Sequence, residues 1–376
     1  MPKHAYIFSA IAIVIASPSH AQSSVTVYGV IDTGLTYVSN AGGSKQFLMD
    51  DSVNSGTRLG FMGSEDLGGG LKAIFTLENG FNVNTGALRQ GDRLFGRQAF
   101  VGLSNNFGTL TLGRGYDMIY TFTSQFDISS WASGYGSHQG NYDRMEWART
   151  DNNVTFVSQD YGGVSFGGQY SFGNVAGNFH RGSLWSVGGQ YSHAPFVAGI
   201  AYTRLNNPND SNALDPFAQI GVRTFLGQPA VTIDPVTGQI TDLYGTNSLQ
   251  IDSEEVFTAG ISYKLGKAQF MGAFSNVKFK GFGKTSNMPT FDVGGLYDIS
   301  AFLIAIFGYQ HTNFEGNHWN QISFGGDYIL SKRTDVYLAT SYVKASDGVH
   351  ANSTASFTPS STNDQASVRI ALRHKF

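Results

Sequence analysis

The feature that most constrains this chain is a two-residue alternation of apolar and polar side chains, which is clearest at its C-terminal end. In residues 365–376, the even-numbered positions are mostly apolar and end in Phe376, whereas the odd-numbered positions carry Arg369, Arg373 and Lys375. Successive side chains of a β-strand point to opposite faces of a sheet, so this pattern predicts a strand with one apolar and one cationic face. A chain that ends inside a strand leaves unpaired backbone amides, and pairing of the first strand with the last would satisfy them. On a barrel closed in this way, the three cationic residues would line the lumen.

The same alternation recurs along the rest of the chain. After the N-terminal segment, about sixteen segments of roughly 9 to 14 residues alternate in this way, joined in turn by short turns and by longer polar connections. Both ends of the chain fall on the short-turn side, and an even number of strands allows the first strand to pair with the last. The sequence therefore predicts an all-β fold, a transmembrane barrel of sixteen antiparallel strands of the outer-membrane type.

Aromatic residues indicate which face of the predicted barrel meets lipid. Tyr and Phe lie at the ends of the apolar faces, for example at Tyr37, Phe75, Tyr263 and Tyr328, which is typical of the aromatic girdles of such barrels. A soluble β-sandwich is the alternative, but it would bury its apolar face against a second sheet and typically use shorter strands. The pattern therefore favours an apolar outer face and a polar lumen.

Residues 1–21 are predicted to be a cleaved signal peptide. Lys3 precedes an apolar run over residues 5–16, and the run is followed by a small-residue cleavage pattern that ends at Ala21. The run is shorter than the roughly 20 residues that a membrane-spanning helix needs. Removal of this segment would leave residues 22–376 as a single barrel domain.

Composition limits the chemistry that this chain can perform. It contains no cysteine, and its formal net charge of −3 gives no sign of a tail that binds nucleic acid. The nine histidines show no metal-ligand spacing. Adjacent carboxylates such as Glu254 and Glu255 would point to opposite faces of a strand, so they cannot act on one substrate. We therefore expect no cofactor, no metal and no enzymatic activity.

Two connections between predicted strands are much longer than the others. They span residues 116–150 and 205–253. Long loops without secondary structure are usually functional in compact domains. The second is most simply a solvated outer loop, whereas the first is the better candidate for a role in the pore.

Five segments carry a family resemblance. Residues 28–38, 57–78, 97–114, 329–343 and 372–376, in this order, resemble the general porins of Gram-negative bacteria, specifically their betaproteobacterial and neisserial branch. This resemblance implies an outer-membrane homotrimer, a third loop folded into the lumen, and passive diffusion of ions and small hydrophilic solutes. It also implies contact with outer-membrane lipid and lipopolysaccharide, and assembly by the outer-membrane barrel machinery through a terminal aromatic signal, Phe376.

The resemblance also assigns candidate pore residues. It identifies residues 116–150 as the constriction loop, with four acidic residues, and it places a basic cluster on the facing wall. The acids are Asp117, Asp127, Asp143 and Glu146, and the basic cluster is Arg58, Arg97, Arg114 and Arg149. Arg97 and Arg114 share the parity of residues assigned to lipid, so they point inward only if a bulge intervenes or the strand begins later. The sign of any ion selectivity stays open at this point.

Two other functions remain as alternatives. The long 205–253 loop would suit an outer-membrane adhesin or structural anchor. A barrel hydrolase would need a histidine at the barrel rim, and the candidates are His138, His180, His193, His311 and His318.

Overall fold

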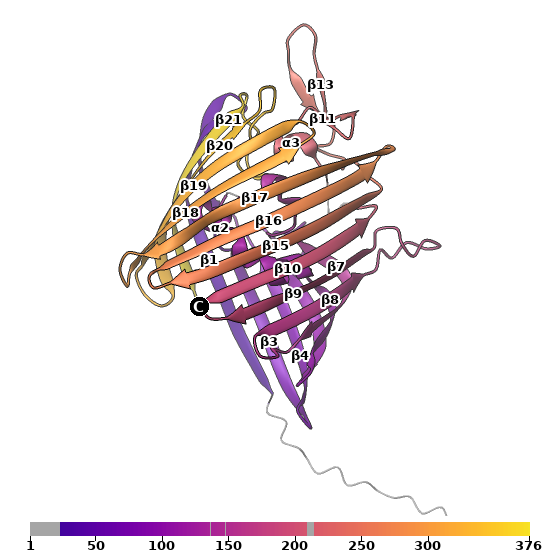
Figure 1. The fold of residues 1–376 in the computed structure, drawn as a ribbon, viewed down its shortest axis with the longest axis vertical. Helices are drawn as coiled ribbons and strands as arrows, with labels where there is room; N and C mark the ends of the chain where they lie inside the picture. Colours follow the sequence, from indigo (N-terminus) through magenta and orange to yellow (C-terminus); the bar gives the residue numbers. More distant parts are fainter. Residues whose placement is uncertain (1–22, 136, 147, 209–213) are drawn as a thin grey trace, which may run out of the picture.

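The computed structural model of the protein describes residues 23–135, 137–146, 148–208 and 214–376, so the predicted signal peptide lies outside the described residues. One antiparallel sheet curves round and closes on itself (Figure 1). Its strands are β1 (Ser24–Ala41), β2 (Ser44–Asp51), β3 (Arg58–Gly68), β4 (Leu71–Gly80), β5 (Gln98–Asn105), β6 (Gly108–Tyr116), β7 (Arg149–Ser158), β8 (Val164–Ser171), β9 (Leu184–His193), β10 (Phe196–Asn206), β15 (Ser253–Leu265), β16 (Ala268–Gly281), β17 (Lys284–Asp298), β18 (Leu303–Phe314), β19 (Asn317–Ile329), β20 (Thr334–Ala345) and β21 (Asp364–Lys375).

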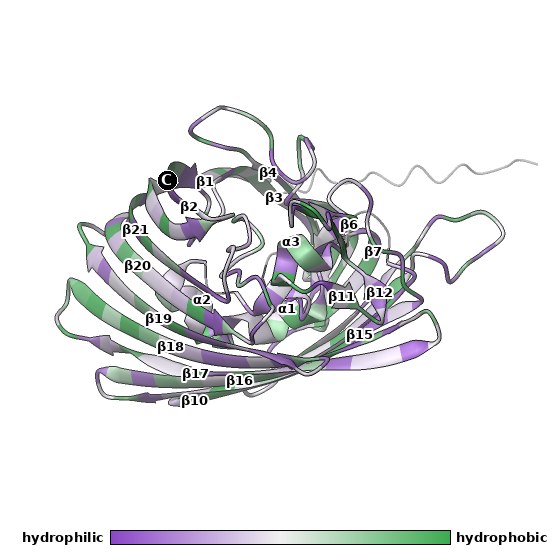
Figure 2. Ribbon diagram, turned by 90° about the horizontal axis from the view of Figure 1, so that it is seen from above, coloured by the Kyte–Doolittle hydropathy of each residue, from purple (hydrophilic) through white to green (hydrophobic). Residues whose placement is uncertain are grey.

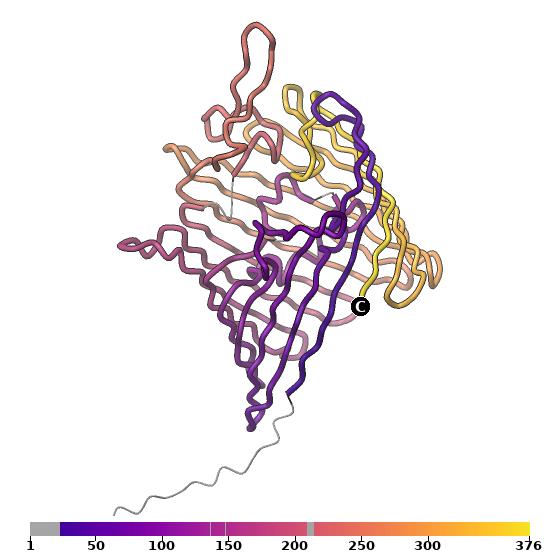
Figure 3. The backbone as a smooth tube through the Cα atoms, turned by 180° about the vertical axis from the view of Figure 1, so that it is seen from behind, coloured from indigo at the N-terminus to yellow at the C-terminus, as the bar shows by residue number. Residues whose placement is uncertain are grey.

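Strand β1 closes the barrel by pairing along both of its edges. One edge pairs with β21, from Val30 opposite Lys375 to Val38 opposite Ser367. The other edge pairs with β3 along its first half and with β2 along its second half, so β2 and β3 together fill one of sixteen strand positions. Figure 3 shows the first strand in indigo beside the last in yellow. The predicted sixteen-stranded barrel, closed by its first and last strands, is confirmed.

The helices are short and lie in the two long connections. The third connection at the loop end, between β6 and β7, contains α1 (Met118–Thr123), η1 (Ser124–Phe126), α2 (Ile128–Ser133) and η2 (Gln139–Asn141). The connection between β10 and β15 contains α3 (Pro216–Ile220) and two small ribbons, β11 (Thr224–Phe225) with β12 (Gln228–Pro229) and β13 (Val231–Ile233) with β14 (Ile240–Asp242). Seen from above, α1 and α2 lie inside the ring of strands (Figure 2). Within the described residues, no helix combines the length and hydropathy that a membrane span requires.

The wall of the barrel is apolar outside and polar inside. On β21 the even-numbered side chains of Val368, Ile370 and Leu372 are 44%, 56% and 47% exposed, as the alternation predicts. Inside, hydroxyl groups pair between neighbouring strands, as in Thr290 with Thr312, whose Oγ1 atoms lie 2.8 Å apart. This inverts the arrangement of a soluble sheet, and it suits a sheet surrounded by lipid.

Glycines on the inner face let the third connection pack directly against the wall. Helix α1 lies on β9 and β10, and α2 lies on β18 and β19. A Cβ atom added to Gly308 of β18 would lie 2.6 Å from the Cα of Ser129, and one added to Gly260 of β15 would lie 2.3 Å from the ring of Phe126. The loop can therefore occupy this position only because these wall residues have no side chain.

A substitution at Gly308 tests this packing. We expect Gly308→Ala to destabilise the protein by about 1 to 3 kcal/mol, because the added methyl group overlaps the backbone of α2. Unfolding by denaturant in detergent would measure the change. Gly326→Ala on β19 is the matched control, because a Cβ there has no described atom within 4 Å. Equal stability of the two variants would contradict the proposed close contact.

Candidate functional site

The lumen contains a cavity of about 1450 Å³ between the wall and the third connection. Loop residues such as Tyr142, Met145 and Glu146 line one part of it. Arginines that extend from the wall near β3 to β7 line another part, and they include all four arginines of the predicted basic cluster. The cavity therefore has one side that is rich in guanidinium groups.

Shared hydrogen-bond acceptors hold these arginines in place. The Glu78 carboxylate on β4 accepts a hydrogen bond from Arg97 Nε at 2.7 Å and lies 3.6 Å from Arg58 Nε. The Tyr116 hydroxyl accepts from Arg97 Nη2 at 3.0 Å and from Arg149 Nη2 at 2.5 Å. The guanidinium of Arg149 also stacks over the Tyr116 ring, 4.5 Å from its centroid. Arg58, Arg97 and Arg149 therefore form one connected group.

Local backbone irregularities explain why Arg97 and Arg114 face inward despite their parity. Arg97 precedes the first residue of β5, so it does not follow the alternation of that strand. Arg114 lies at a shift in register between β6 and β7, which falls between Gly113 and Gly115. Its side chain donates to the Gly96 carbonyl oxygen at 2.8 Å and to Asp151 Oδ1 at 2.6 Å.

Arg93 belongs to the same wall but was not among the predicted residues. Its Nη1 lies 2.8 Å from Asp151 Oδ2, and it also lines the cavity. The signal was present in the sequence, because Arg89, Arg93 and Arg97 recur at four-residue intervals before β5. We call the following five residues the arginine wall: Arg58, Arg93, Arg97, Arg114 and Arg149. Among the described residues, Arg58 and Arg97 pair with Glu78, and Arg93 and Arg114 pair with Asp151, so the five guanidinium groups outnumber these two carboxylates.

The four acidic residues of the loop occupy two kinds of position. Asp117 and Asp143 are buried; Asp117 caps α1 and pairs with Arg144 Nε at 2.5 Å, and Asp143 binds His138. Asp127 and Glu146 line the cavity, and Asp127 is also buried, with a relative exposure of 1%. Asp127 also caps α2 by accepting a hydrogen bond from Ser130 N at 3.0 Å. Two of the four acids are therefore at the cavity, and the other two stabilise the loop.

A cluster of carboxylates surrounds His138 behind the loop. His138 Nε2 lies 3.5 Å from an oxygen of Asp292, which projects inward from β17, and 3.9 Å from Asp127 Oδ1. Burial raises the pKa of Asp127 well above its usual range, and Asp292 and Asp143 add to this effect. Burial alone would lower the pKa of His138, but the carboxylates of Asp143 and Asp127 raise it well above its usual range. Sequence reasoning missed Asp292, because nothing local distinguishes it from other inward polar residues.

A second buried group of charges lies at the barrel seam. Arg369 of β21 is inward-facing but buried, and Tyr135 of the loop packs near it. Its guanidinium lies 3.3 Å from Asp32 Oδ1 of β1, and it also binds Asp50. The prediction that Arg369 lines the lumen is therefore wrong, because the loop covers it. Arg373 does line the cavity.

Three comparisons place the chain among known proteins. Residues 9–348 match the profile of a family described as Gram-negative porin. Outer membrane porin protein 32 of Delftia acidovorans is 29% identical, and the match covers 98% of each chain. Among solved structures, an anion-selective porin from Comamonas acidovorans has a TM-score of 0.72 at 23% identity over 94% of this chain and all 100% of that chain. The trimer form of Vibrio cholerae OmpT, an outer membrane protein, has a TM-score of 0.64 at 15% identity over 94% and 99% of the two chains. The two structures support the fold.

Proposed function

Because this chain belongs to the family of Gram-negative porins, we propose that its lumen prefers anions and that the arginine wall sets this preference. The protein is an outer-membrane porin of a Gram-negative bacterium, a water-filled channel for the passive diffusion of ions and small hydrophilic solutes. The single observation that carries the proposal is the group of five arginines along one side of the cavity, four of which pair with the carboxylates of Glu78 and Asp151.

Electrostatics gives this arrangement its effect. Rings of charged side chains in a narrow aqueous passage set ion preference, and low-dielectric walls concentrate their field. Glu78, Tyr116 and Asp151 hold the guanidinium groups in position, so little side-chain freedom is lost when an anion passes. Planar guanidinium groups also bind carboxylate and phosphate groups in a bidentate manner, which favours small organic anions. The description of the Comamonas structure as anion-selective supports the same preference for anions.

We propose different roles for the two long connections between strands. Residues 116–150 form the constriction loop, which is supported by its helices inside the ring of strands and by Asp127 and Glu146 at the cavity. Residues 205–253 form an outer loop at the opposite end from the short turns, which are on the periplasmic side in barrels of this kind. Residues 1–21 are proposed to be removed as a signal peptide, leaving the single domain 22–376.

Three partners complete the proposal. We propose a homotrimer, supported by the trimer form of the OmpT neighbour. We propose that Phe376 is the signal for the barrel assembly machinery. Its backbone N–H donates to the Gly29 carbonyl oxygen at 3.1 Å, and its own carbonyl oxygen accepts from Gly29 N at 3.1 Å. The third partner is the lipopolysaccharide that surrounds the barrel.

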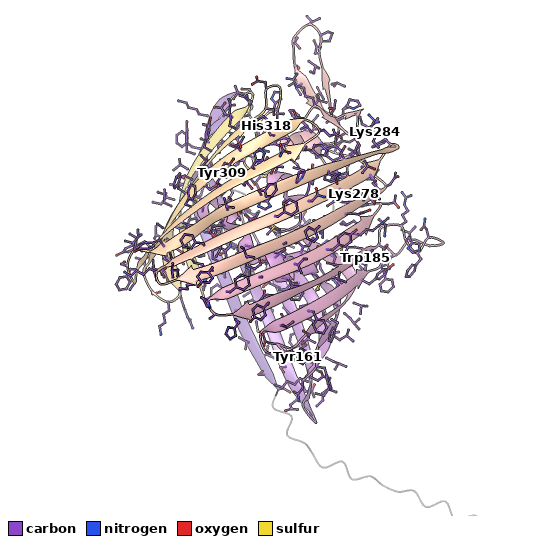
Figure 4. All side chains as sticks on the ribbon, viewed as in Figure 1. Tyr161, Trp185, Lys278, Lys284, Tyr309 and His318 are labelled. Carbon is purple, nitrogen blue, oxygen red and sulfur yellow. The ribbon has the colours of Figure 1, made fainter. Side chains whose placement is uncertain are left out.

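An outward-facing cationic cluster supports contact with lipopolysaccharide. Lys278 and Lys280 of β16 lie 3.1 and 2.9 Å from the oxygens of Glu255 on β15, and Arg204 of β10 lies 3.4 Å from the same carboxylate. Three cations thus share one carboxylate on the outer face. Figure 4 shows Lys278 toward the loop end of the wall, with Lys284 beyond it. Phosphate groups of an anionic lipid are the chemistry that such a cluster would bind.

Catalysis and adhesion are not part of this proposal. The family consists of channels rather than enzymes, and we propose the same for this chain. Of the candidate rim histidines, His138 is buried behind the loop and His311 bonds with Asn320 on the outer face. Ohmic conductance in a planar bilayer, without release of a lipid or peptide product, is the outcome that separates a channel from a hydrolase.

Reversal of one charge in the arginine wall tests the selectivity. We expect Arg58→Glu to shift the reversal potential under a salt gradient toward cation preference. In water, a unit charge changes the energy of an ion about 4 Å away by about 1 kcal/mol. The anion-to-cation permeability ratio should therefore fall about fivefold or more. Lys267→Glu makes the same charge change in the β15–β16 turn and should leave the ratio unchanged. A wild-type preference for cations would refute the proposed sign.

Loss of the terminal aromatic tests assembly. We expect deletion of Phe376 to lower the yield of folded barrel in the outer membrane severalfold, because it removes both the side chain and the backbone pairing with Gly29. Phe376→Tyr retains the ring and should assemble as the wild type does. Quantifying heat-resistant trimers in membrane fractions distinguishes the two variants, and equal yields would mean that Phe376 is not the signal.

The outer cationic cluster can be tested through the lipid that copurifies with the protein. We expect Lys278→Ala combined with Lys280→Ala to lower the lipopolysaccharide bound per chain by about half or more, because two of the three cations are removed. Lys264→Ala combined with Lys267→Ala changes two lysines at the other end of the same strand pair and serves as the control. Equal amounts of lipopolysaccharide on both double variants would exclude the cluster as a binding site.

A further inference from the structure

The cluster around His138 has the composition of a metal site and lies between the third connection and the wall. Asp127 and His138 come from the loop, and Asp292 comes from β17. All three side chains are almost completely buried, with relative exposures of 1%, 2% and 0%. One nitrogen and two carboxylate oxygens, one from each residue, lie within 4.8 Å of one another. The loop and the wall therefore present three donor atoms to one point.

Neighbouring groups already orient these donors. His138 Nδ1 is hydrogen-bonded to the Asp143 carboxylate, which leaves Nε2 directed toward Asp127 and Asp292. A carboxylate that binds the far nitrogen of a histidine is the usual outer-shell partner in metal sites. The oxygens of Asp292 accept hydrogen bonds from Ser129 N at 3.0 Å and from Ser129 Oγ at 2.6 Å. The donor set is therefore held before any ligand arrives.

Two polar atoms of this cluster have no hydrogen-bond partner among the described residues. They are His138 Nε2 and Asp127 Oδ2. A buried polar atom without a partner is destabilising, and native proteins rarely leave one without a bound water, ion or ligand. Here both atoms belong to residues whose other polar atoms are already bonded. A ligand that accepts electron pairs from both would satisfy them.

The charge of the cluster indicates a cation. Asp127, Asp143 and Asp292 surround a single imidazole, and Glu146 lies close enough to interact with all of them. Glu146 also has one buried carboxylate oxygen, Oε2, without a hydrogen-bond partner in the described part of the chain. Burial of several carboxylates is costly unless they are paired or bind a metal ion. The cluster therefore favours a ligand with more than one positive charge.

We propose that Asp127, His138 and Asp292 bind a divalent transition-metal ion, of which Zn²⁺ is the representative. Imidazole nitrogen together with carboxylate oxygen suits Zn²⁺ better than Ca²⁺ or Mg²⁺, which prefer oxygen alone. Bonds of about 2.0 to 2.2 Å place tetrahedral donors roughly 3.3 to 3.6 Å apart. His138 Nε2 lies 3.5 and 3.9 Å from the two carboxylates, so small side-chain movements complete the site. Water or Glu146 supplies the fourth ligand.

Such an ion would fasten the loop to the wall at a point opposite the arginine wall. The two loop ligands flank α2, and the wall ligand lies on a different strand from those that carry the arginines. The ion would therefore fix the position of the loop without entering the cationic side of the cavity. This inference rests on the position of the loop alone, and it does not depend on the proposed anion preference.

Zinc binding to the folded, chelator-treated protein in detergent tests the proposal. Equilibrium dialysis against Zn²⁺ alone, followed by elemental analysis, should give one ion per chain, and X-ray absorption should show one imidazole nitrogen with oxygen ligands. We expect His138→Gln and Asp292→Asn each to weaken binding at least about tenfold. His311→Gln removes a histidine from the outer face and should bind as the wild type does.

Several outcomes would overturn the proposal. These are the absence of stoichiometric binding, zinc that remains bound in His138→Gln, or zinc that is lost in His311→Gln. Asp292→Asn also changes the bonds to Ser129, so if this variant does not fold, His138→Gln decides the result alone. Conductance and reversal potential are measured on the same samples, so failure of the zinc proposal can be distinguished from failure of the proposed anion preference. Loss of the zinc site is expected to leave both quantities unchanged.

Discussion

The structure depends first on the need to satisfy every backbone hydrogen bond in a medium without water. A sheet in lipid can do this only if it has no free edge, and β1 removes the edge by pairing with β21 on one side and with β2 and β3 on the other. Closure then decides the side-chain pattern, because each residue faces either lipid or lumen. The outer face carries Ile and Leu, and the inner face carries paired hydroxyl groups and buried charges.

The lumen is shaped by the loop that the wall accommodates. Inward glycines on β15 and β18 leave room for Phe126 and α2, so the loop lies in van der Waals contact with one side of the barrel. The other side stays open and carries the arginine wall. One side holds the loop through packing and buried carboxylates, and we propose that the other presents cations to solutes.

Buried charges connect the loop to the wall at two places. The Arg369 group joins the tip of the loop to the seam between β1 and β21, where Asp32, Asp50 and Tyr337 complete its bonds. The His138 cluster joins the loop to β17 on another part of the wall. Removing one partner from a buried ionic group is strongly destabilising, so these groups resist displacement of the loop. A rigid loop is what a channel of fixed size requires.

The sequence by itself determined the barrel, its strand number, the lipid-facing parity and the two long connections, because these follow from an alternation that local physics imposes on every strand in lipid. Through the family resemblance it also proposed Arg58, Arg97, Arg114 and Arg149 as pore residues, but it could not orient Arg97 and Arg114. Their direction depends on where β5 begins and on a register shift in β6, which only the pairing of neighbouring strands decides.

The tertiary structure alone decided which charges meet. Asp292 joins His138 across 154 positions of sequence, and Arg369 is covered by a loop residue rather than open to the lumen. No local pattern encodes such contacts, because they arise where a folded loop reaches a distant strand.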